Sequence, residues 1–304
     1  MDFLYILESL RVPGLNELML LVTKLGEETA FLAAALIVFW CVDKRMGYYL
    51  MSVGFIGTMS NQFLKLWFRI PRPWVIDPGF SILEQAREAA TGYSFPSGHS
   101  QSGVGTFGSL AAAVKNKWVK GVCIVICLLV PLSRMYIGVH TPADVLVGSG
   151  MALALVLVLR RPVMEHTDRA MKPVIALMLA MALGLLLFVE KYPFPADVDE
   201  HNLASGIKNA YTMLGSISGV AVVYVLDRKV LRFDTNALWW AQILKVALGM
   251  ALVLGVKEGL RGPLDALFAG HMAARAVRYF LIVVAAGGLW PVTFRWFAGL
   301  GVKK

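Results

Sequence analysis

The sequence predicts an all-α protein, a polytopic transmembrane helix bundle of about nine spans preceded by N-terminal interfacial helices. Two observations on composition favour this fold class. The 304 residues are 58% hydrophobic and only 16% charged, whereas soluble domains carry about 25% charged residues. Mean hydropathy is +0.65. In addition, apolar stretches near the roughly 20 residues that a helix needs to cross a bilayer recur along the chain.

The first stretch, residues 2–25, is apolar but interrupted by charged side chains, among them Glu8, Arg11 and Glu17. Such a pattern is typical of amphipathic helices that lie in the membrane interface. Pro13 removes a backbone donor and separates the stretch into two parts. We therefore expect one or two interfacial helices here and no clean span.

Each of the nine expected spans is an apolar stretch between charged residues. They cover residues 28–42, 47–68, 97–114, 118–137, 142–159, 173–189, 205–226, 238–256 and 275–297. The third is rich in Gly, Ser and Ala, which let helices approach closely in a bilayer. Two polar connections interrupt the series. One is 257–273, and the other is 69–96, which contains four prolines and in which a short helix is expected near 81–90.

The distribution of Lys and Arg predicts the orientation in the membrane. On this topology one side receives five basic segments, namely 44–45, 115–120, 160–172, 228–232 and 303–304. Short loops rich in Lys and Arg stay in the cytoplasm, so the other side, with 69–96 and 140–144, faces outward. The charge of +9 does not indicate a nucleic-acid partner, because the cations lie in short loops rather than on one face. The outward side would be periplasmic or extracellular in a bacterium, or lumenal in a eukaryotic endomembrane. We expect an integral protein of a bacterial plasma membrane.

A first set of candidate site residues lies at the start of the third span, in the sequence Pro96-Ser97-Gly98-His99. Ser97 is a natural N-cap, and the N–H groups of a helix start bind anions. Gly98 lets the backbone approach an oxyanion closely, and His99 would lie beside it. The alternative is that Ser-Gly merely begins a helix and that His99 is an interfacial residue.

A second set surrounds the start of the fifth span. Thr141 is a plausible N-cap and Pro142 suits the first helical position. His140 and Asp144 are four residues apart, so their side chains can meet. A carboxylate on one imidazole nitrogen fixes the tautomer and raises the basicity of the other nitrogen, as a nucleophilic histidine requires. Alternatively, Asp144 is a capping-box acid; both roles are compatible.

Three cations complete the candidate site. Arg134 ends the fourth span, where a charge is unfavourable without an anionic partner. Lys65 and Arg72 are seven residues apart, near two helical turns, although Pro71 must disturb the second turn. An Arg grips a phosphate with a bidentate fork, and a Lys acts on it as a point charge. The alternative is that these cations snorkel to lipid headgroups.

Together these residues resemble a family. The type-2 phosphatidic acid phosphatase superfamily, which includes acid phosphatases, glucose-6-phosphatase and vanadium haloperoxidases, has three motifs in this order and spacing. They are matched by Lys65-(six residues)-Arg72-Pro73, Pro96-Ser97-Gly98-His99 and Ser133-Arg134-(five)-His140-(three)-Asp144. The resemblance covers roughly residues 26–160. We therefore divide the chain into an interfacial segment 1–25, a phosphatase core 26–160 and additional C-terminal helices 161–304.

The resemblance implies a role for each motif residue. His140 would attack phosphorus and form a phosphohistidine, Asp144 would orient His140, and His99 would protonate the leaving oxygen and then activate water. The scheme needs no metal and no other cofactor. The phosphoryl oxygens would be held by Lys65, Arg72, Ser97, Gly98 and Arg134.

The function expected from this resemblance is a membrane lipid phosphatase with its site at the outer interface. Its partners would be the bilayer and a lipid phosphate or diphosphate, with undecaprenyl diphosphate as the first guess. Phosphatidate, phosphatidylglycerol phosphate and sphingoid phosphates stay open as substrates, as does the oligomeric state. One alternative is a lipid phosphotransferase, in which a lipid hydroxyl takes the phosphoryl group. Another is a non-catalytic lipid transporter, motivated by the additional C-terminal spans.

Overall fold

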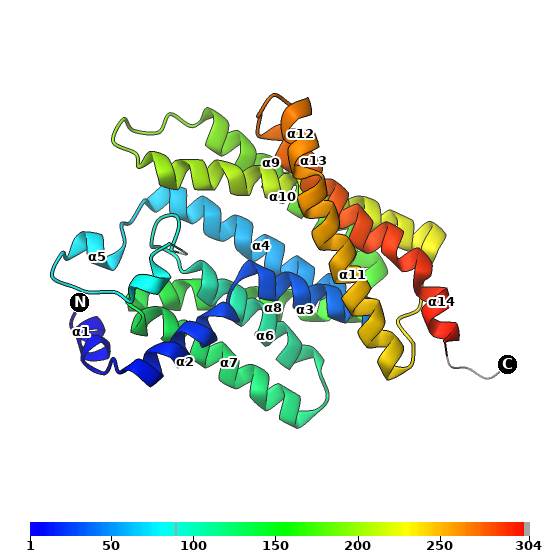
Figure 1. The fold of residues 1–304 in the computed structure, drawn as a ribbon, viewed down its shortest axis with the longest axis horizontal. Coiled ribbons are helices and arrows are strands. Elements are labelled where there is room, and N and C mark those ends of the chain that lie inside the picture. The colour runs from blue at the N-terminus through cyan, green and yellow to red at the C-terminus, as the bar shows by residue number, and fades with distance from the viewer. Residues whose placement is uncertain (89, 301–304) are drawn as a thin grey trace. The chain divides into compact units, whose positions relative to one another are not determined.

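The computed structural model in Figure 1 describes residues 1–88 and 90–300, which form helices joined by loops and contain no strand. Contacts divide the chain into two compact units. The first contains residues 1–35, 49–167 and 193–206, and the second contains residues 36–48, 168–192 and the chain from Ile207 onward. All three motifs therefore lie in the first unit.

Two helices begin the chain, α1 (Asp2–Ser9) and α2 (Pro13–Lys24). The prediction of two helices separated at Pro13 is confirmed, since Pro13 is the first residue of α2. Leu4 of α1 packs in a cluster with Phe80 and Ile82, and Met19 of α2 packs with Tyr136. These helices therefore cover the loops that carry the motifs. Their position at a membrane interface stays a prediction.

The motifs are carried by a group of packed helices in the first unit. After α3 (Glu28–Cys41) and α4 (Lys44–Phe68) come α6 (Gly98–Ala113), α7 (Lys117–Tyr136) and α8 (Pro142–Glu165), and α6 packs against both α7 and α8. Small residues allow this packing: a Cβ at Gly103 would lie 2.8 Å from Cγ1 of Val130. The prediction that small side chains in this helix permit close approach is confirmed.

The connection between α4 and α6 is only partly regular. A single helical turn, α5, spans Pro73–Ile76, and a 3-10 turn, η1, spans Glu84–Ala86. The short helix expected near 81–90 is thus three residues long. Its position is fixed by buried Ala86, which joins the cluster around Tyr136. This connection is held over the motif helices by side-chain contacts described below.

The second unit contains α9 (Thr167–Lys191) from residue 168, α10 (Glu200–Leu226) from residue 207, α11 (Trp239–Gly259), α12 (Arg261–Leu267), α13 (Ala273–Val284) and α14 (Phe294–Gly299). Its members include segments far apart in the chain: Trp40 Nε1 donates to the carbonyl oxygen of Ala286 at 2.9 Å. Lys44 Nζ lies 2.8 Å from Asp227 Oδ1, and that aspartate is 1% exposed. The connection expected at 257–273 contains the short helix α12.

Six described helices are long and apolar enough to cross a membrane, and they begin at Lys117, Pro142, Thr167, Glu200, Trp239 and Ala273. They correspond to six of the nine expected spans. Helix α3 is apolar but has only 14 residues. Helix α6 has 16 residues, about 24 Å of helix at 1.5 Å per residue. Helix α4 is long enough but carries polar side chains that include Asn61 and Lys65. These three spans stay predictions.

Candidate active site

The second motif forms the start of α6. Ser97 caps this helix: its Oγ accepts a hydrogen bond from the N–H of Ser100 at 3.3 Å, and Gly98 is the first helical residue. The N–H of Ser97 donates to the carbonyl oxygen of Asp144 at 2.9 Å. The predicted N-cap is therefore confirmed, and this helix start is joined directly to the third motif.

The third motif forms the start of α8. Thr141 and Asp144 make a complete capping box, in which Thr141 Oγ1 accepts from the Asp144 N–H at 3.3 Å and Asp144 Oδ2 accepts from the Thr141 N–H at 2.7 Å. The same Oδ2 lies 3.5 Å from Nδ1 of His140. Asp144 thus caps the helix and faces the imidazole at once, so the two interpretations of this residue hold together.

The hydrogen bonds of His140 define its tautomer. Arg72 Nη1 lies 2.9 Å from His140 Nε2. A guanidinium can only donate, so Nε2 must present its lone pair. The ring proton is then on Nδ1, which faces Asp144. His140 is 1% exposed, and its Nε2 is oriented as a nucleophile would be.

Ser94 is a site residue that the motifs did not reveal. Its Oγ donates to Asp144 Oδ2 at 2.6 Å and lies 3.5 Å from His140 Nδ1. Its N–H donates to the carbonyl oxygen of Ile70 at 2.8 Å. Ser94 therefore links the connection after α4 to the His140–Asp144 pair. In the sequence, only its position two residues before Pro96 indicated that Ser94 lies near the site.

The cations of the first motif also hold the backbone. The Arg72 guanidinium donates to the carbonyl oxygens of Thr91 at 2.8 Å, Gly92 at 3.1 Å and Val139 at 2.9 Å. Lys65 Nζ donates to the carbonyl oxygen of Tyr93 and, at 3.4 Å, to that of Ser94. Both side chains are buried. They join α4, residues 91–94 and the third motif into one structure.

The remaining candidate residues, Arg134 and His99, affect the pKa of the His140 imidazole. Burial, followed by the charges of Arg72, Arg134 and Lys65 and by His99, lowers the pKa of His140 well below 6.5. Burial also lowers the pKa of Arg72 to about 10, against the opposing effect of Asp144, so this guanidinium stays charged at neutral pH. The site thus combines a neutral imidazole with cationic groups, which favours an anionic ligand.

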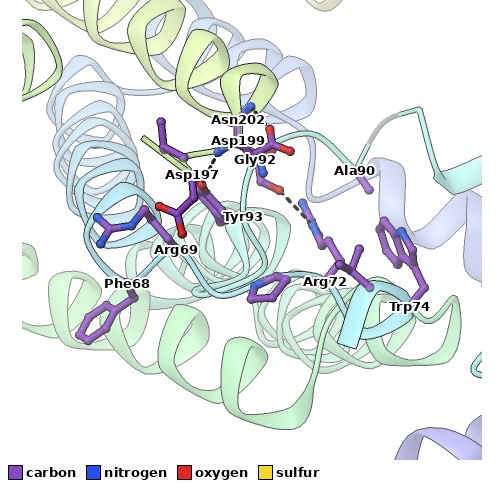
Figure 2. Close-up of a pocket in the computed structure, with 13 residues that line it drawn as sticks. Phe68, Arg69, Arg72, Trp74, Ala90, Gly92, Tyr93, Asp197, Asp199 and Asn202 are labelled. Carbon is purple, nitrogen blue, oxygen red and sulfur yellow. Dashed lines mark hydrogen bonds between the residues drawn. The ribbon is translucent and has the colours of Figure 1, made fainter. Parts of the chain in front are cut away.

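A cavity of about 560 Å³ opens beside Arg72. Figure 2 shows Arg72, Trp74 and Tyr93 on its wall together with the carboxylates of Asp197 and Asp199. The N–H of Asp199 donates to the Tyr93 hydroxyl at 3.3 Å, which holds the segment before α10 against the connection. This segment carries none of the three motifs. The cavity provides room for a group attached to an anion bound at Arg72.

The structure brings the predicted residues together. Lys65, Arg72, His140 and Asp144 are joined by the hydrogen bonds above, and Ser97 is joined to Asp144 through the backbone. Gly98 follows Ser97 at the helix start, and Arg134 and His99 act on His140 electrostatically. The described residues contain no group of three or more His, Cys, Asp or Glu side chains placed to hold a metal ion. The individual roles stay predictions.

Comparison with protein families gives two matches. Residues 44–168 match the PAP2 superfamily, and residues 211–303 match a family described as PAP2 superfamily phosphatase, transmembrane extension. The first match contains all three motifs. The second falls within the second compact unit.

Curated proteins give matches to three kinds of phosphatase. The chain is 30% identical to an undecaprenyl-diphosphatase of Sulfolobus acidocaldarius over 45% of this chain and 66% of the relative. It is 30% identical to phosphatidylglycerophosphatase B of Bacillus subtilis over 48% of this chain and 74% of the relative. It is 27% identical to sphingosine-1-phosphate phosphatase 1 of Mus musculus over 78% of this chain and 57% of the relative. The matches thus span 66% of the archaeal relative and 57% of the mouse relative. No solved structure is significantly similar to the chain.

Proposed function

The chain belongs to the PAP2 superfamily, and on that premise we propose that it is a membrane lipid phosphatase acting through a phosphohistidine. The observation that carries the proposal is the environment of His140. Its Nε2 lone pair faces Arg72 at 2.9 Å, and its Nδ1 faces Asp144 at 3.5 Å. A phosphoryl group held by Arg72 would therefore meet the nucleophile directly.

In the first step the Nε2 lone pair of His140 forms a bond to phosphorus. The bond between phosphorus and the lipid oxygen breaks, and that oxygen takes a proton from His99. A bound phosphate favours the protonated form of His99, because opposite charges stabilise one another. Asp144 stabilises the positive charge that develops on the His140 ring. The lipid alcohol leaves where the substrate is a monophosphate, the lipid monophosphate leaves where it is a diphosphate, and the phosphoryl group stays on His140.

In the second step water attacks phosphorus and gives a proton to His99. The bond between phosphorus and Nε2 breaks, its electron pair returns to His140, and inorganic phosphate is released. Lys65, Arg72 and Arg134 would hold the phosphoryl oxygens throughout, with the Ser97 hydroxyl and the Gly98 N–H at the helix start. The scheme uses these residues alone, so we propose that the reaction needs no metal ion.

Undecaprenyl diphosphate is the substrate that we propose first. A relative with that activity in its name matches 45% of the chain. Phosphatidylglycerol phosphate and sphingoid phosphates are the next candidates, because relatives named for phosphatidylglycerophosphate and sphingosine-1-phosphate also match. The positive-inside pattern supports an orientation in which this site faces outward, and we propose that the membrane is a bacterial plasma membrane.

The test offers the purified full chain a panel of lipid phosphates in detergent micelles, with chelator present. We expect release of inorganic phosphate from at least one of them and loss of that release in His140→Ala. Rapid quenching should trap labelled phosphate on the wild-type protein but not on this variant. Absence of release from every lipid by the folded wild-type protein would overturn the proposal.

Two alternatives have distinct results in the same assay. A lipid phosphotransferase would transfer label from His140 to an added lipid alcohol faster than to water. A non-catalytic lipid transporter would release no phosphate, and His140→Ala would leave lipid movement across vesicles unchanged. Retention of the full His140–Asp144–Arg72 arrangement favours catalysis over transport.

A further inference from the structure

Arg134 differs from the other two cations in how it is held. Its side chain is 1% exposed, and its Nη1 donates to Thr23 Oγ1 at 2.7 Å. In the described part of the chain its Nε is buried without a hydrogen-bond partner. Lys65 and Arg72, in contrast, each donate to at least two backbone carbonyls. The hydroxyl of Thr23 therefore has a large influence on where the Arg134 guanidinium points.

Thr23 comes from a part of the chain outside the three motifs. It lies on α2, one residue before the helix ends, and is 7% exposed. The turn after α2 contacts the second motif, because a Cβ at Gly26 would lie 2.7 Å from both the His99 carbonyl oxygen and Val130 Cγ1. The end of α2 thus lies against the helix of His99 and the helix of Arg134 together.

The beginning of α2 is also fixed on the third motif. Arg11 Nε donates to the carbonyl oxygen of Tyr136 at 3.0 Å, and its Nη1 donates to that of Ser81 at 2.9 Å. The Tyr136 hydroxyl donates to Asn16 Oδ1 at 2.8 Å. Helix α2 is therefore attached near both of its ends, and Thr23 is presented to Arg134 from a fixed support.

We propose that Thr23 is a positioning residue for Arg134, and that α2 is thereby part of the active-site structure of this chain. The proposal rests on the phosphatase function proposed above. With Nη1 anchored on Thr23, the Nε N–H is left for a phosphoryl oxygen. Productive sites need such groups within about 0.5 Å of their working positions. A guanidinium that loses this anchor would bind the phosphoryl group less well and stabilise the transition state less.

The test compares Thr23→Val, which keeps the shape but removes the hydroxyl, with Thr23→Ser, which keeps the hydroxyl. Thr212→Val is a matched control: Thr212 is 6% exposed and accepts from Arg275 Nε, also at 2.7 Å, in the second unit. The assay measures kcat, KM and inhibition by inorganic phosphate on the full chain in detergent, with thermal unfolding in parallel. A hydrogen bond to a charged group contributes about 1.5–3 kcal/mol, equivalent to about a 10- to 100-fold change.

We expect Thr23→Val to lower kcat/KM by about 10- to 100-fold and to weaken inhibition by inorganic phosphate, and we expect Thr23→Ser to stay within about threefold of wild type. Thr212→Val should leave kcat/KM and the inhibition by inorganic phosphate within about threefold of wild type, even if its Tm falls as much as that of Thr23→Val. In an Arg134→Lys background, Thr23→Val should have little further effect, because residues that act through one another are not additive.

The positioning role would be overturned if Thr23→Val and Thr212→Val had equal kcat and KM. It would also be overturned if the effects of Thr23→Val and Arg134→Lys on kcat/KM were fully additive. Neither result would contradict the phosphatase function. A wild-type protein that releases no phosphate from any lipid overturns the function itself, so the two failures are distinguishable. If Thr23→Val does not fold, Thr23→Ala takes its place. Equal kinetics of Thr23→Ala and Thr23→Ser would then refute the proposal.

Discussion

Gly148 on α8 lies against the start of α6, and its replacement by alanine should inactivate the enzyme. A Cβ at this position would lie 2.5 Å from the carbonyl oxygen of Ser97 and 3.3 Å from the Ser97 nitrogen. Ordinary contacts begin at 3.4 Å, so one of the two helices must move by about 0.9 Å. Because the atoms met are backbone, no side chain can rotate away.

The magnitude follows from what the displaced atoms do. Ser97 caps α6 and its N–H bonds Asp144, so a shift there moves the proposed phosphate-binding groups relative to His140. A misplacement of about 1 Å costs about 100-fold in rate. Overpacking destabilises by about 1–3 kcal/mol, and alanine regains about 1 kcal/mol over glycine in a helix. We therefore expect kcat to fall about 100-fold while stability falls by at most about 2 kcal/mol.

Gly150→Ala is the matched control on the same helix, since nothing lies within 4 Å of a Cβ at Gly150. It gains the helix propensity of alanine without the clash, so it should be at least as stable as wild type and fully active. The assay is steady-state phosphate release in detergent, with thermal unfolding alongside. The reasoning is refuted if Gly148→Ala retains kcat within threefold of Gly150→Ala.

Three further predictions concern the groups around His140. Ser94→Ala should lower kcat about tenfold with little change in KM, because Asp144 loses one of its donors but keeps the Thr141 N–H; an unchanged kcat would refute it. Arg72→Lys should raise KM by more than tenfold and lower Tm, since a lysine cannot bond three carbonyls and a phosphate together; wild-type values in both would refute it. The pKa of His140 lies below 6.5 through burial and then the charge of Arg72, so the neutral nucleophile persists as pH falls through 6.5. Protonation of His140 should therefore cause no fall in kcat/KM there, whereas stability should decline below about 6.5 because the unfolded chain binds the proton more readily; a fall in kcat/KM at or above pH 6.5 that is traced to His140 would refute it.

The sequence predicted the elements of the site that depend on short-range geometry. His140 and Asp144 meet because they are four residues apart across a helix start, and Thr141 and Ser97 cap helices because their residue types and positions favour it. These are local rules of backbone geometry, so spacing alone was sufficient. The clustering of the three motifs, in contrast, was inferred from a resemblance, and the hydrogen bonds of Arg72 supply its physical basis.

Long-range contacts were not predictable in the same way. Thr23 and Arg134 are 111 residues apart and Ser94 and Asp144 are 50 apart, and no local pattern links such pairs. The cavity wall contains Asp197 and Asp199 from the segment before α10, which carries none of the three motifs. The expected spans that did not meet the length and hydropathy of a crossing helix include α4 and α6, whose polar residues serve the site. Polar motif residues in these helices lower the hydropathy on which the prediction of spans relied.

The double use of Arg72 links substrate binding to the exposure of the nucleophile. In the structure its Nη1 N–H covers the Nε2 lone pair of His140 at 2.9 Å. Its other N–H groups hold carbonyl oxygens and keep the guanidinium in place. A phosphoryl oxygen is a better acceptor for a charged donor than a neutral imidazole, because charge-assisted hydrogen bonds are about twice as strong. Because a planar guanidinium fixes the direction of its N–H groups, we expect an arriving anion to shift the whole guanidinium slightly, so that this N–H bonds the anion and the lone pair is uncovered facing phosphorus. On the proposed mechanism, binding of the phosphoryl group and activation of His140 are then one event, and we expect a lysine, with no fixed fork, to be a poor substitute at this position.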